Sequence, residues 1–202
     1  MKLYFSPGAC SLSPHIVLHE AGLAHTIEKV DLRSKTTASG QDFRAINSKG
    51  YVPALDVDNG TVLTEGPAII QFLADRAPEK LLAPAHGTIE RYQLMSWLNY
   101  IGTELHKNYG PLFNPASSAE AKAGALKNLA QRYDYVEKML EGRDYLMGER
   151  FSVADVYLFV VTNWAGHLHF DLSPWPNLQA FQKRIFVRPA VQQALRAEGL
   201  IQ

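Results

Sequence analysis

Residues 2–22 read KLYFSPGACSLSPHIVLHEAG, and this stretch decides the fold of the first part of the chain. Lys2–Phe5 is a short, mostly apolar run that a Ser-Pro-Gly sequence ends, which predicts a buried strand followed by a turn. From Ser11 onward the apolar residues recur with helical spacing. A strand, a turn and a helix in this order place Cys10 at the beginning of a helix.

The pattern continues outward from this stretch through residue 80. We expect a strand over 25–30, a short helix over 43–46, a hairpin over 52–63 and a helix that begins at Gly66-Pro67. The hairpin signal is Asp58-Asn59-Gly60, because Asn-Gly readily adopts the positive φ angles of a tight turn. Parallel pairing through the first helix and antiparallel pairing through the hairpin predict a small mixed sheet with helices on its faces.

The pattern changes class after residues 81–87, which we interpret as a linker between a domain over 1–80 and an all-helical domain over 88–202. Capping-box patterns begin at Ser117 and Ser152. The first helix is expected over 88–108, with an interruption near Gly110-Pro111. A second helix should run from the Ser117 cap to about residue 140, and a third should begin after Ser152. Two further helices are expected over 177–186 and 190–197.

Composition excludes several classes of function. The 202 residues carry 20 Lys and Arg against 20 Asp and Glu, so neither nucleic acid nor an anionic membrane is indicated as a partner. No apolar run is long enough for a membrane span, and the N-terminus lacks a signal-peptide pattern. One cysteine allows no internal disulfide, and we therefore expect a cytoplasmic protein.

Cys10 is the first candidate for chemistry. The free N–H groups at a helix N-terminus favour a thiolate, which is the reactive form of cysteine. Ser13 stands where a dithiol oxidoreductase would carry a second cysteine, so Cys10 could form a mixed disulfide only with an outside thiol. The alternative is an inert, buried cysteine.

Two backbone sites accompany Cys10. Val52-Pro53 opens a predicted strand, where a cis peptide bond would expose the Val52 backbone to an extended peptide. Glu65 and the N–H groups at Gly66 could together hold the ammonium and carboxylate of an amino acid. The alternatives are an ordinary edge-strand proline and a glutamate that only complements the helix dipole.

A polar stripe is predicted on the first long helix. Asn99, Thr103 and His106 are spaced i, i+4, i+7, and a stripe ending in His106-Lys107 could polarise a thiol. The alternative is a solvated helix face. The other histidines show no metal-ligand spacing, and we interpret His15 and His19 as a helix-surface pair, so no metal is expected.

Together these segments resemble the bacterial, beta-class glutathione S-transferases over essentially the whole chain. The resemblance is carried by Pro7–Ser11, Gly50–Leu55, Leu63–Gly66, Trp97–Lys107 and Phe151–Asp155. It implies a thioredoxin-like α/β N-terminal domain, an all-α C-terminal domain and a twofold homodimer. It also implies glutathione as co-substrate, with no prosthetic group.

The resemblance further assigns roles to residues of this chain. Cys10, His106 and Lys107 would be catalytic, Val52 before a cis Pro53 would pair with the peptide backbone, and Lys35 would meet the glycine carboxylate. The full glutathione-binding set would be Cys10, Ser11, Lys35, Val52, Pro53, Glu65, Gly66, Asn99, Thr103, Glu104 and His106. Asn99, Thr103 and Glu104 would lie near the subunit interface.

Two positions depart from the family pattern. Gly66 replaces a frequent serine, which should weaken the clamp on the γ-glutamyl end by about 1 kcal/mol for one hydrogen bond. Tyr4 and Phe5 are interchanged relative to many relatives, and neighbouring strand residues face opposite sides. A tyrosine hydroxyl is therefore not expected as the main thiol activator, which leaves Cys10, Ser11 and His106.

The resulting hypothesis is conjugation of glutathione to small hydrophobic electrophiles, as in detoxification, with thiol–disulfide exchange through Cys10 as a possible second reaction. The electrophile is expected around Tyr109, Phe113, Trp164 and His167. Two alternatives remain open: a non-catalytic ligand-binding or protein-interaction member of the same fold, and a dehalogenase or isomerase that uses glutathione as cofactor.

Overall fold

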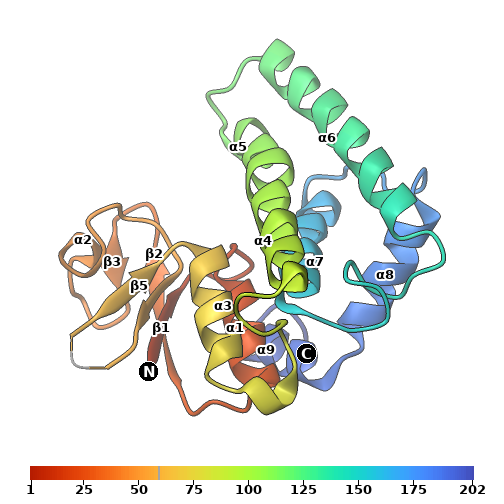
Figure 1. Cartoon of the computed structure of the whole chain (residues 1–202). Helices are drawn as coiled ribbons and strands as arrows, with labels where there is room; N and C mark the ends of the chain where they lie inside the picture. The colour runs from red at the N-terminus through yellow and green to blue at the C-terminus, as the bar shows by residue number, and fades with distance from the viewer. Residues whose placement is uncertain (59) are drawn as a thin grey trace. The chain divides into compact units, whose positions relative to one another are not determined.

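The computed structural model describes residues 1–58 and 60–202 and separates into two compact units (Figure 1). The first unit contains residues 1–83 together with 187–202, and the second contains residues 84–186. The last helix of the chain thus packs with the N-terminal unit, whereas the sequence pattern alone placed it with the other helices. Among the described residues, no helix is both long and apolar enough to cross a membrane.

One mixed sheet forms the centre of the first unit, and five strands of the described residues build it in the order β3-β2-β1-β4-β5. The strands are β1 (Lys2–Phe5), β2 (Thr26–Asp31), β3 (Thr36–Thr37), β4 (Ala54–Asp56) and β5 (Val62–Thr64). β1 and β2 are parallel, and β4 pairs antiparallel with both β1 and β5. The hairpin and the mixed sheet are confirmed. The Asp58-Asn59-Gly60 turn prediction falls on Asn59, which lies outside the described residues, and the short strand β3 was not predicted.

The helices of this unit are α1 (Leu12–Glu20), α2 (Phe43–Ile46), α3 (Gly66–Asp75) and α9 (Pro189–Ala197), with a 3₁₀ turn, η1 (Pro78–Lys80). α1 packs against both α3 and α9. Every residue from Leu12 to Leu18 is buried, as expected for a helix covered on all sides. Arg188 just before α9 forms a bidentate pair with Glu20 at 2.6 and 2.9 Å. These contacts fix α1 and the turn that precedes it.

The second unit is helical. It contains α4 (Ile89–Tyr100), a π-helical segment η2 (Ile101–His106), α5 (Lys107–Phe113), α6 (Ala119–Met139), α7 (Val153–His167) and α8 (Pro176–Phe186). The expected interruption at Gly110-Pro111 is wrong, because α5 continues through both residues to Phe113. The irregularity lies earlier, in η2.

α7 is buried along most of its length, and the cap predicted at its N-terminus is present. The Asp155 carboxylate accepts hydrogen bonds from the Ser152 backbone N–H at 2.7 Å, the Ser152 hydroxyl at 2.9 Å and the Leu146 N–H at 2.8 Å. The carboxylate therefore joins the start of α7 to the loop before it.

Candidate active site

Cys10 lies in the turn between β1 and α1, directly before the N-cap residue Ser11. The buried Ser11 hydroxyl closes this turn, because it accepts from the Ser6 N–H at 3.1 Å and donates to the Ser6 carbonyl at 3.2 Å. The Gly8 N–H donates to the Glu198 carboxylate at 2.9 Å, and Gly8 has a φ of 71°. The Ser11 side chain thus stabilises the turn that positions the Cys10 thiol.

The Cys10 thiol is held in its protonated form. Its Sγ donates to the Val52 carbonyl at 3.3 Å. Burial and, to a smaller extent, the negative charge of Glu65 raise the pKa of Cys10, the backbone N–H groups of Cys10 and Ser11 lower it, and together these effects bring the pKa to about 12. The backbone N–H groups at the helix N-terminus thus act in the expected direction, but loss of hydration outweighs them and favours the thiol.

The Val52-Pro53 peptide bond is cis, as the sequence suggested. Hydrogen bonds from the Asn47 side chain to the Tyr51 carbonyl (2.7 Å) and from the Gly50 N–H to the Asn47 carbonyl (2.8 Å) shape the loop that leads to it. Val52 itself is buried. The loop therefore positions the Val52 carbonyl where it accepts the hydrogen bond from Cys10.

Lys35 is attached to the same loop. Its Nζ donates to the Gly50 carbonyl at 2.9 Å and lies 5.6 Å from the centre of the exposed Tyr51 ring. The Lys35 ammonium group is thereby attached to the same loop whose Val52 carbonyl contacts Cys10.

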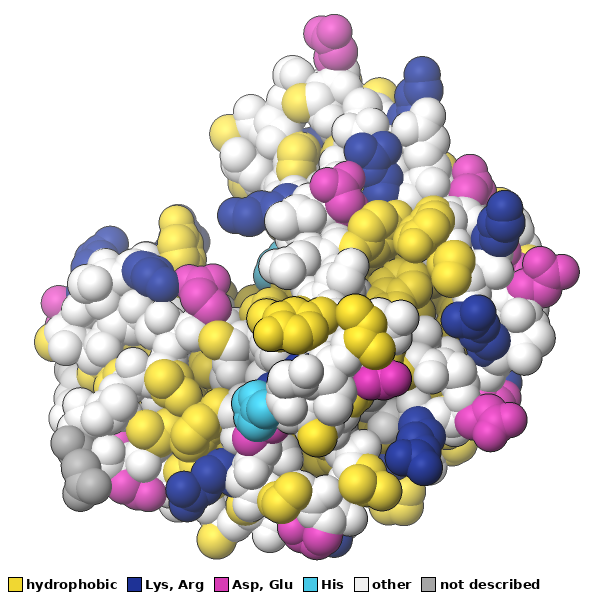
Figure 2. All heavy atoms as spheres, viewed as in Figure 1, with side chains coloured by type: hydrophobic (Ala, Val, Ile, Leu, Met, Phe, Trp, Pro, Cys, Tyr) yellow, Lys and Arg dark blue, Asp and Glu magenta, His cyan; other side chains and the backbone are white. Residues whose placement is uncertain are grey.

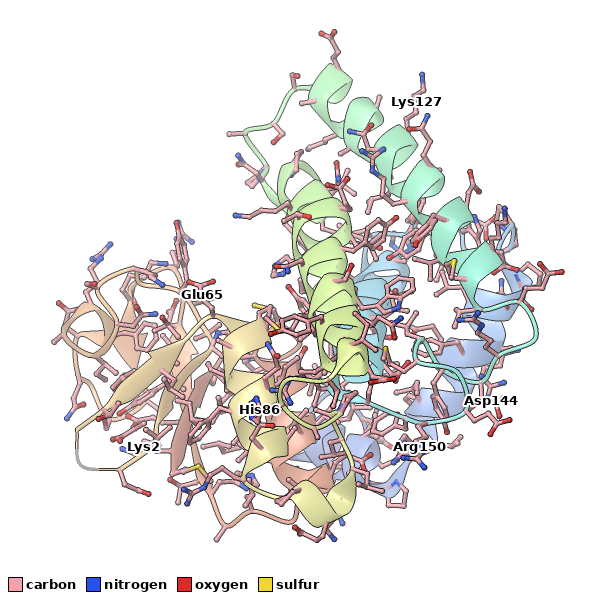
Figure 3. All side chains as sticks on the ribbon, viewed as in Figure 1. Lys2, Glu65, His86, Lys127, Asp144 and Arg150 are labelled. Carbon is pink, nitrogen blue, oxygen red and sulfur yellow. The ribbon has the colours of Figure 1, made fainter. Side chains whose placement is uncertain are left out.

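Glu65 and Gly66 lie at the N-terminus of α3, where Figure 3 labels Glu65. Glu65 has a φ of 70°, a strained conformation for a residue with a side chain, and such strain gathers at functional sites. Its carboxylate is mostly exposed and pairs with Lys49 Nζ at 2.6 Å. A Cβ atom on Gly66 would lie 3.8 Å from the Pro53 ring. The start of α3 is therefore beside the cis-proline loop.

The first unit thus brings together the candidate residues that it contains. Cys10 contacts Val52, Pro53 adjoins Gly66, and the Glu65 charge acts on the Cys10 thiol. The result is a thiol, a backbone segment that leads to a cis proline, and a helix N-terminus with a carboxylate. This arrangement can hold an extended peptide that carries both a thiol and an α-amino acid end.

In the second unit, His106 ends the π-helical segment η2. Its Nδ1 lies 2.7 Å from the Tyr157 hydroxyl, and its ring is 4.8 Å from that of Trp164. Burial, with a smaller contribution from the Lys107 charge, lowers the pKa of His106 to about 4. His106 is therefore neutral at pH 7, and it does not form a cationic pair with Lys107.

The predicted polar stripe is divided in the structure. Asn99 and Thr103 are exposed, and the Thr103 hydroxyl donates to the Asn99 carbonyl at 3.0 Å. Glu104 pairs with Arg132 of α6 at 3.1 Å. His106 instead packs against α7, because the π-helical segment changes the angular spacing of the residues along it.

Tyr157 was missed by the sequence reasoning although a signal existed. It lies seven residues before Trp164 in α7, so the two side chains share one face of the helix, and both contact His106.

The residues expected around the electrophile do gather. The Trp164 ring lies 5.4 Å from Tyr109 and 5.5 Å from Phe113, and Phe113 stacks on His167 at 6.3 Å. Tyr109, however, is completely buried, and its hydroxyl lies 2.8 Å from that of Tyr133. Burial raises the pKa of Tyr109 far above its usual range. It is a core residue, and of the four residues expected around the electrophile the other three, Phe113, Trp164 and His167, offer accessible surface.

Comparison with known proteins decides the family. Residues 8–76 match the N-terminal domain of glutathione S-transferase, and residues 100–189 match the C-terminal domain. The chain belongs to the glutathione S-transferase family. The expectation of a glutathione transferase with a thioredoxin-like domain, a helical domain and glutathione as co-substrate is confirmed.

Individual transferases resemble the chain over nearly its full length. Glutathione S-transferase GstA of Escherichia coli O157:H7 is 47% identical over 99% of this chain and 100% of its own. A solved ternary complex of BphK, a bacterial transferase, is 59% identical with a TM-score of 0.98, covering 98% of this chain and 100% of that one. The beta-class transferase of Sphingomonas chungbukensis is 48% identical with a TM-score of 0.97, and both chains are covered completely. The beta-class resemblance is thus confirmed.

Proposed function

We propose that this transferase joins the sulfur of glutathione to small, hydrophobic electrophiles. The observation that carries the proposal is the contact of the Cys10 thiol with the Val52 carbonyl, beside a helix N-terminus that bears a carboxylate. The Val52 backbone would pair with the cysteine of the tripeptide in the manner of an added strand. A sphingomonad relative, 48% identical, has been solved in complex with glutathione, which supports the same ligand here.

The two ends of glutathione match the charges around this contact. The exposed Glu65 carboxylate would accept the γ-glutamyl ammonium group, and the Gly66 N–H would donate to its carboxylate. Lys35 would pair with the glycine carboxylate. A tripeptide that spans these groups places its own sulfur beside Cys10.

A protonated Cys10 acts as a hydrogen-bond donor to the incoming sulfur, which lowers the pKa of the glutathione thiol. The proton leaves that thiol, the thiolate forms a bond to the electrophilic carbon, and the leaving group departs with its electron pair. His106 is a neutral ring whose Nδ1 shares a hydrogen bond with the Tyr157 hydroxyl. The roles of His106 and Lys107 in this step, and of Asn99, Thr103 and Glu104 in binding, follow from the family resemblance.

Thiol–disulfide exchange is the second candidate reaction. Cys10 is the sole cysteine of the chain and is half-buried. Its sulfur would attack the glutathione sulfur of a disulfide between glutathione and a small thiol, which forms a mixed disulfide on Cys10 and releases the small thiol with the Cys10 proton. A second glutathione would then attack this mixed disulfide, release oxidised glutathione and return the proton to Cys10, since Ser13 supplies no thiol.

Replacement of Cys10 by alanine tests these assignments. We expect conjugation to an activated aryl chloride to persist at a reduced rate, whereas exchange with a disulfide substrate is abolished. Unchanged rates of both reactions would contradict any role for Cys10. Retention on immobilised glutathione without turnover of any electrophile would support the non-catalytic alternative.

We also propose that the transferase is a homodimer that works in the cytoplasm. Ile89, Tyr92 and Met95 form an apolar row on one face of α4, with 66%, 59% and 38% of their surfaces exposed. Figure 2 shows hydrophobic side chains gathered over this helical unit. The cytoplasmic assignment rests on the single free cysteine, which a reducing compartment would preserve.

A further inference from the structure

Three histidines of the first unit converge at the end of α1. His15 and His19 are one helical turn apart, and His25 lies just before β2. One ring nitrogen from each lies within 4.8 Å of the other two. The ring centres of His19 and His25 are 4.9 Å apart, and those of His15 and His19 are 5.2 Å apart. The interpretation of His15 and His19 as a surface pair is wrong, since His15 is only 1% exposed.

The hydrogen bonds of these histidines select one nitrogen in each ring. The Nδ1 of His15 lies 2.9 Å from the buried Glu198 carboxylate. The Nδ1 of His25 lies 2.7 Å from the Leu23 carbonyl. Both oxygens accept, so each Nδ1 carries a hydrogen, and Nε2 is the nitrogen left in each ring to bind a metal.

His19 supplies the third nitrogen. Within the part of the chain that the structure describes, its Nε2 is buried and has no hydrogen-bond partner. Buried polar atoms without partners are rare in folded proteins and call for an explanation. A cation bound by the neighbouring imidazoles would provide the missing partner.

We propose that His15, His19 and His25 bind a divalent transition metal of the zinc class through their Nε2 atoms. Three imidazoles and an open fourth position for water form a coordination set that suits Zn²⁺. Zinc–nitrogen bonds of about 2.0 Å require the nitrogens to approach to about 3.3 Å. Because His19 and His25 are only partly buried, rotation of these two rings can close the difference.

The surrounding groups fit such a site. A carboxylate or a carbonyl that accepts the second ring N–H orients a histidine ligand toward a metal, and Glu198 and Leu23 have these positions here. The buried Glu198 charge also balances part of the charge of the cation. Since Glu198 follows α9, the metal would join α1, the segment before β2 and the C-terminal helix. The site shares no ligand with the transferase chemistry, and Glu198 links the two because it also accepts from the Gly8 N–H of the turn that presents Cys10.

Titration of Zn²⁺ into the full-length chain, stripped of metal and without a polyhistidine tag, tests the proposal. We expect one zinc per chain by calorimetry, and a thermal midpoint that rises with zinc concentration. His19→Gln and His25→Gln, which replace partly exposed rings, should each weaken zinc binding more than tenfold. The matched control is His86→Gln, which removes an exposed histidine of the second unit and should bind as the wild type does (Figure 3).

Three further measurements complete the test. A Cys10→Ala background should bind zinc unchanged, which excludes the thiol as a ligand. Circular dichroism should show the fold of every variant intact. Tetrahedral Co²⁺ absorbs visible light far more strongly than hexacoordinate Co²⁺, so an intense visible band is expected in the wild type and lost in His19→Gln. Absence of zinc uptake at roughly 100 µM free metal, or equal affinity in the wild type and both ligand variants, would overturn the proposal.

Discussion

At the scale of single residues, the site depends on opposing effects on one thiol. Helix-terminal N–H groups favour a Cys10 thiolate, but burial and the nearby Glu65 charge favour the thiol, and the balance leaves Cys10 as a donor to Val52. A donor at this place can stabilise the thiolate of a bound substrate. The substrate, rather than the protein, would then carry the reactive sulfur.

Gly66 gives a direct test of the proposed clamp on the γ-glutamyl end. A side chain there meets only the Pro53 ring at 3.8 Å, which is ordinary contact, so Gly66→Ser should fold normally. The added hydroxyl should contribute one hydrogen bond and strengthen glutathione binding by about fivefold, or about 1 kcal/mol. Gly66→Ala is the matched control that adds the Cβ atom alone. Calorimetry that shows equal affinity for the serine and alanine variants would refute this role.

His106 predicts a pH dependence of stability. Its pKa falls from about 6.5 in the unfolded chain to about 4 in the folded protein, so folding favours the neutral ring. The corresponding stability is complete above pH 6.5 and is lost as the pH falls through 4. The thermal midpoint should therefore decrease less between pH 7 and pH 4.5 in His106→Gln than in the wild type. Parallel curves for the two proteins would show that burial does not lower this pKa.

At the scale of elements, the strand, turn and helix around Cys10 could be predicted from sequence because their signals are local. Pro-Gly ends the strand, and the Ser11 side chain closes the turn through Ser6. The cap of α7 is local for the same reason. The π-helical segment before Lys107 was not predictable, because packing of His106 against Tyr157 and Trp164 belongs to tertiary structure. The neutral states of Cys10 and His106 likewise depend on burial, which a sequence does not show.

The α7 cap should contribute measurably to the stability of the helical unit. Asp155→Ala removes an acceptor from three donors, two of which are backbone N–H groups. Unsatisfied buried donors cost about 1–3 kcal/mol each, so the variant should unfold at clearly lower urea concentration. Asp171→Ala is the control, since Asp171 is an exposed turn residue that bonds to Ser173. Similar midpoints for both variants would contradict the importance of the cap.

At the scale of the whole molecule, the apolar row on α4 predicts a dimer. Light scattering of the purified chain should give twice the mass of one chain. Tyr92→Glu places a charge in the row and should shift the protein toward monomer, whereas Leu126→Glu on α6, which is 37% exposed, should not. A monomeric wild type, or a dimer that withstands the Tyr92 substitution, would mean that this row is not the interface.

The central claim is that residues of the first unit bind glutathione, and a single binding measurement tests it most directly. The groups proposed to hold the two ends and the cysteine of the tripeptide (Lys35, Val52, Glu65 and Gly66) belong to the first unit, and the aromatic cluster at Trp164 belongs to the second. Calorimetric titration of glutathione into the wild type and into Glu65→Ala tests whether the residues of the first unit bind glutathione. We predict one glutathione per chain for the wild type and at least tenfold weaker binding for the variant, from loss of a charged contact. No uptake by the wild type at millimolar glutathione, or equal affinity in both proteins, would contradict this account of the site.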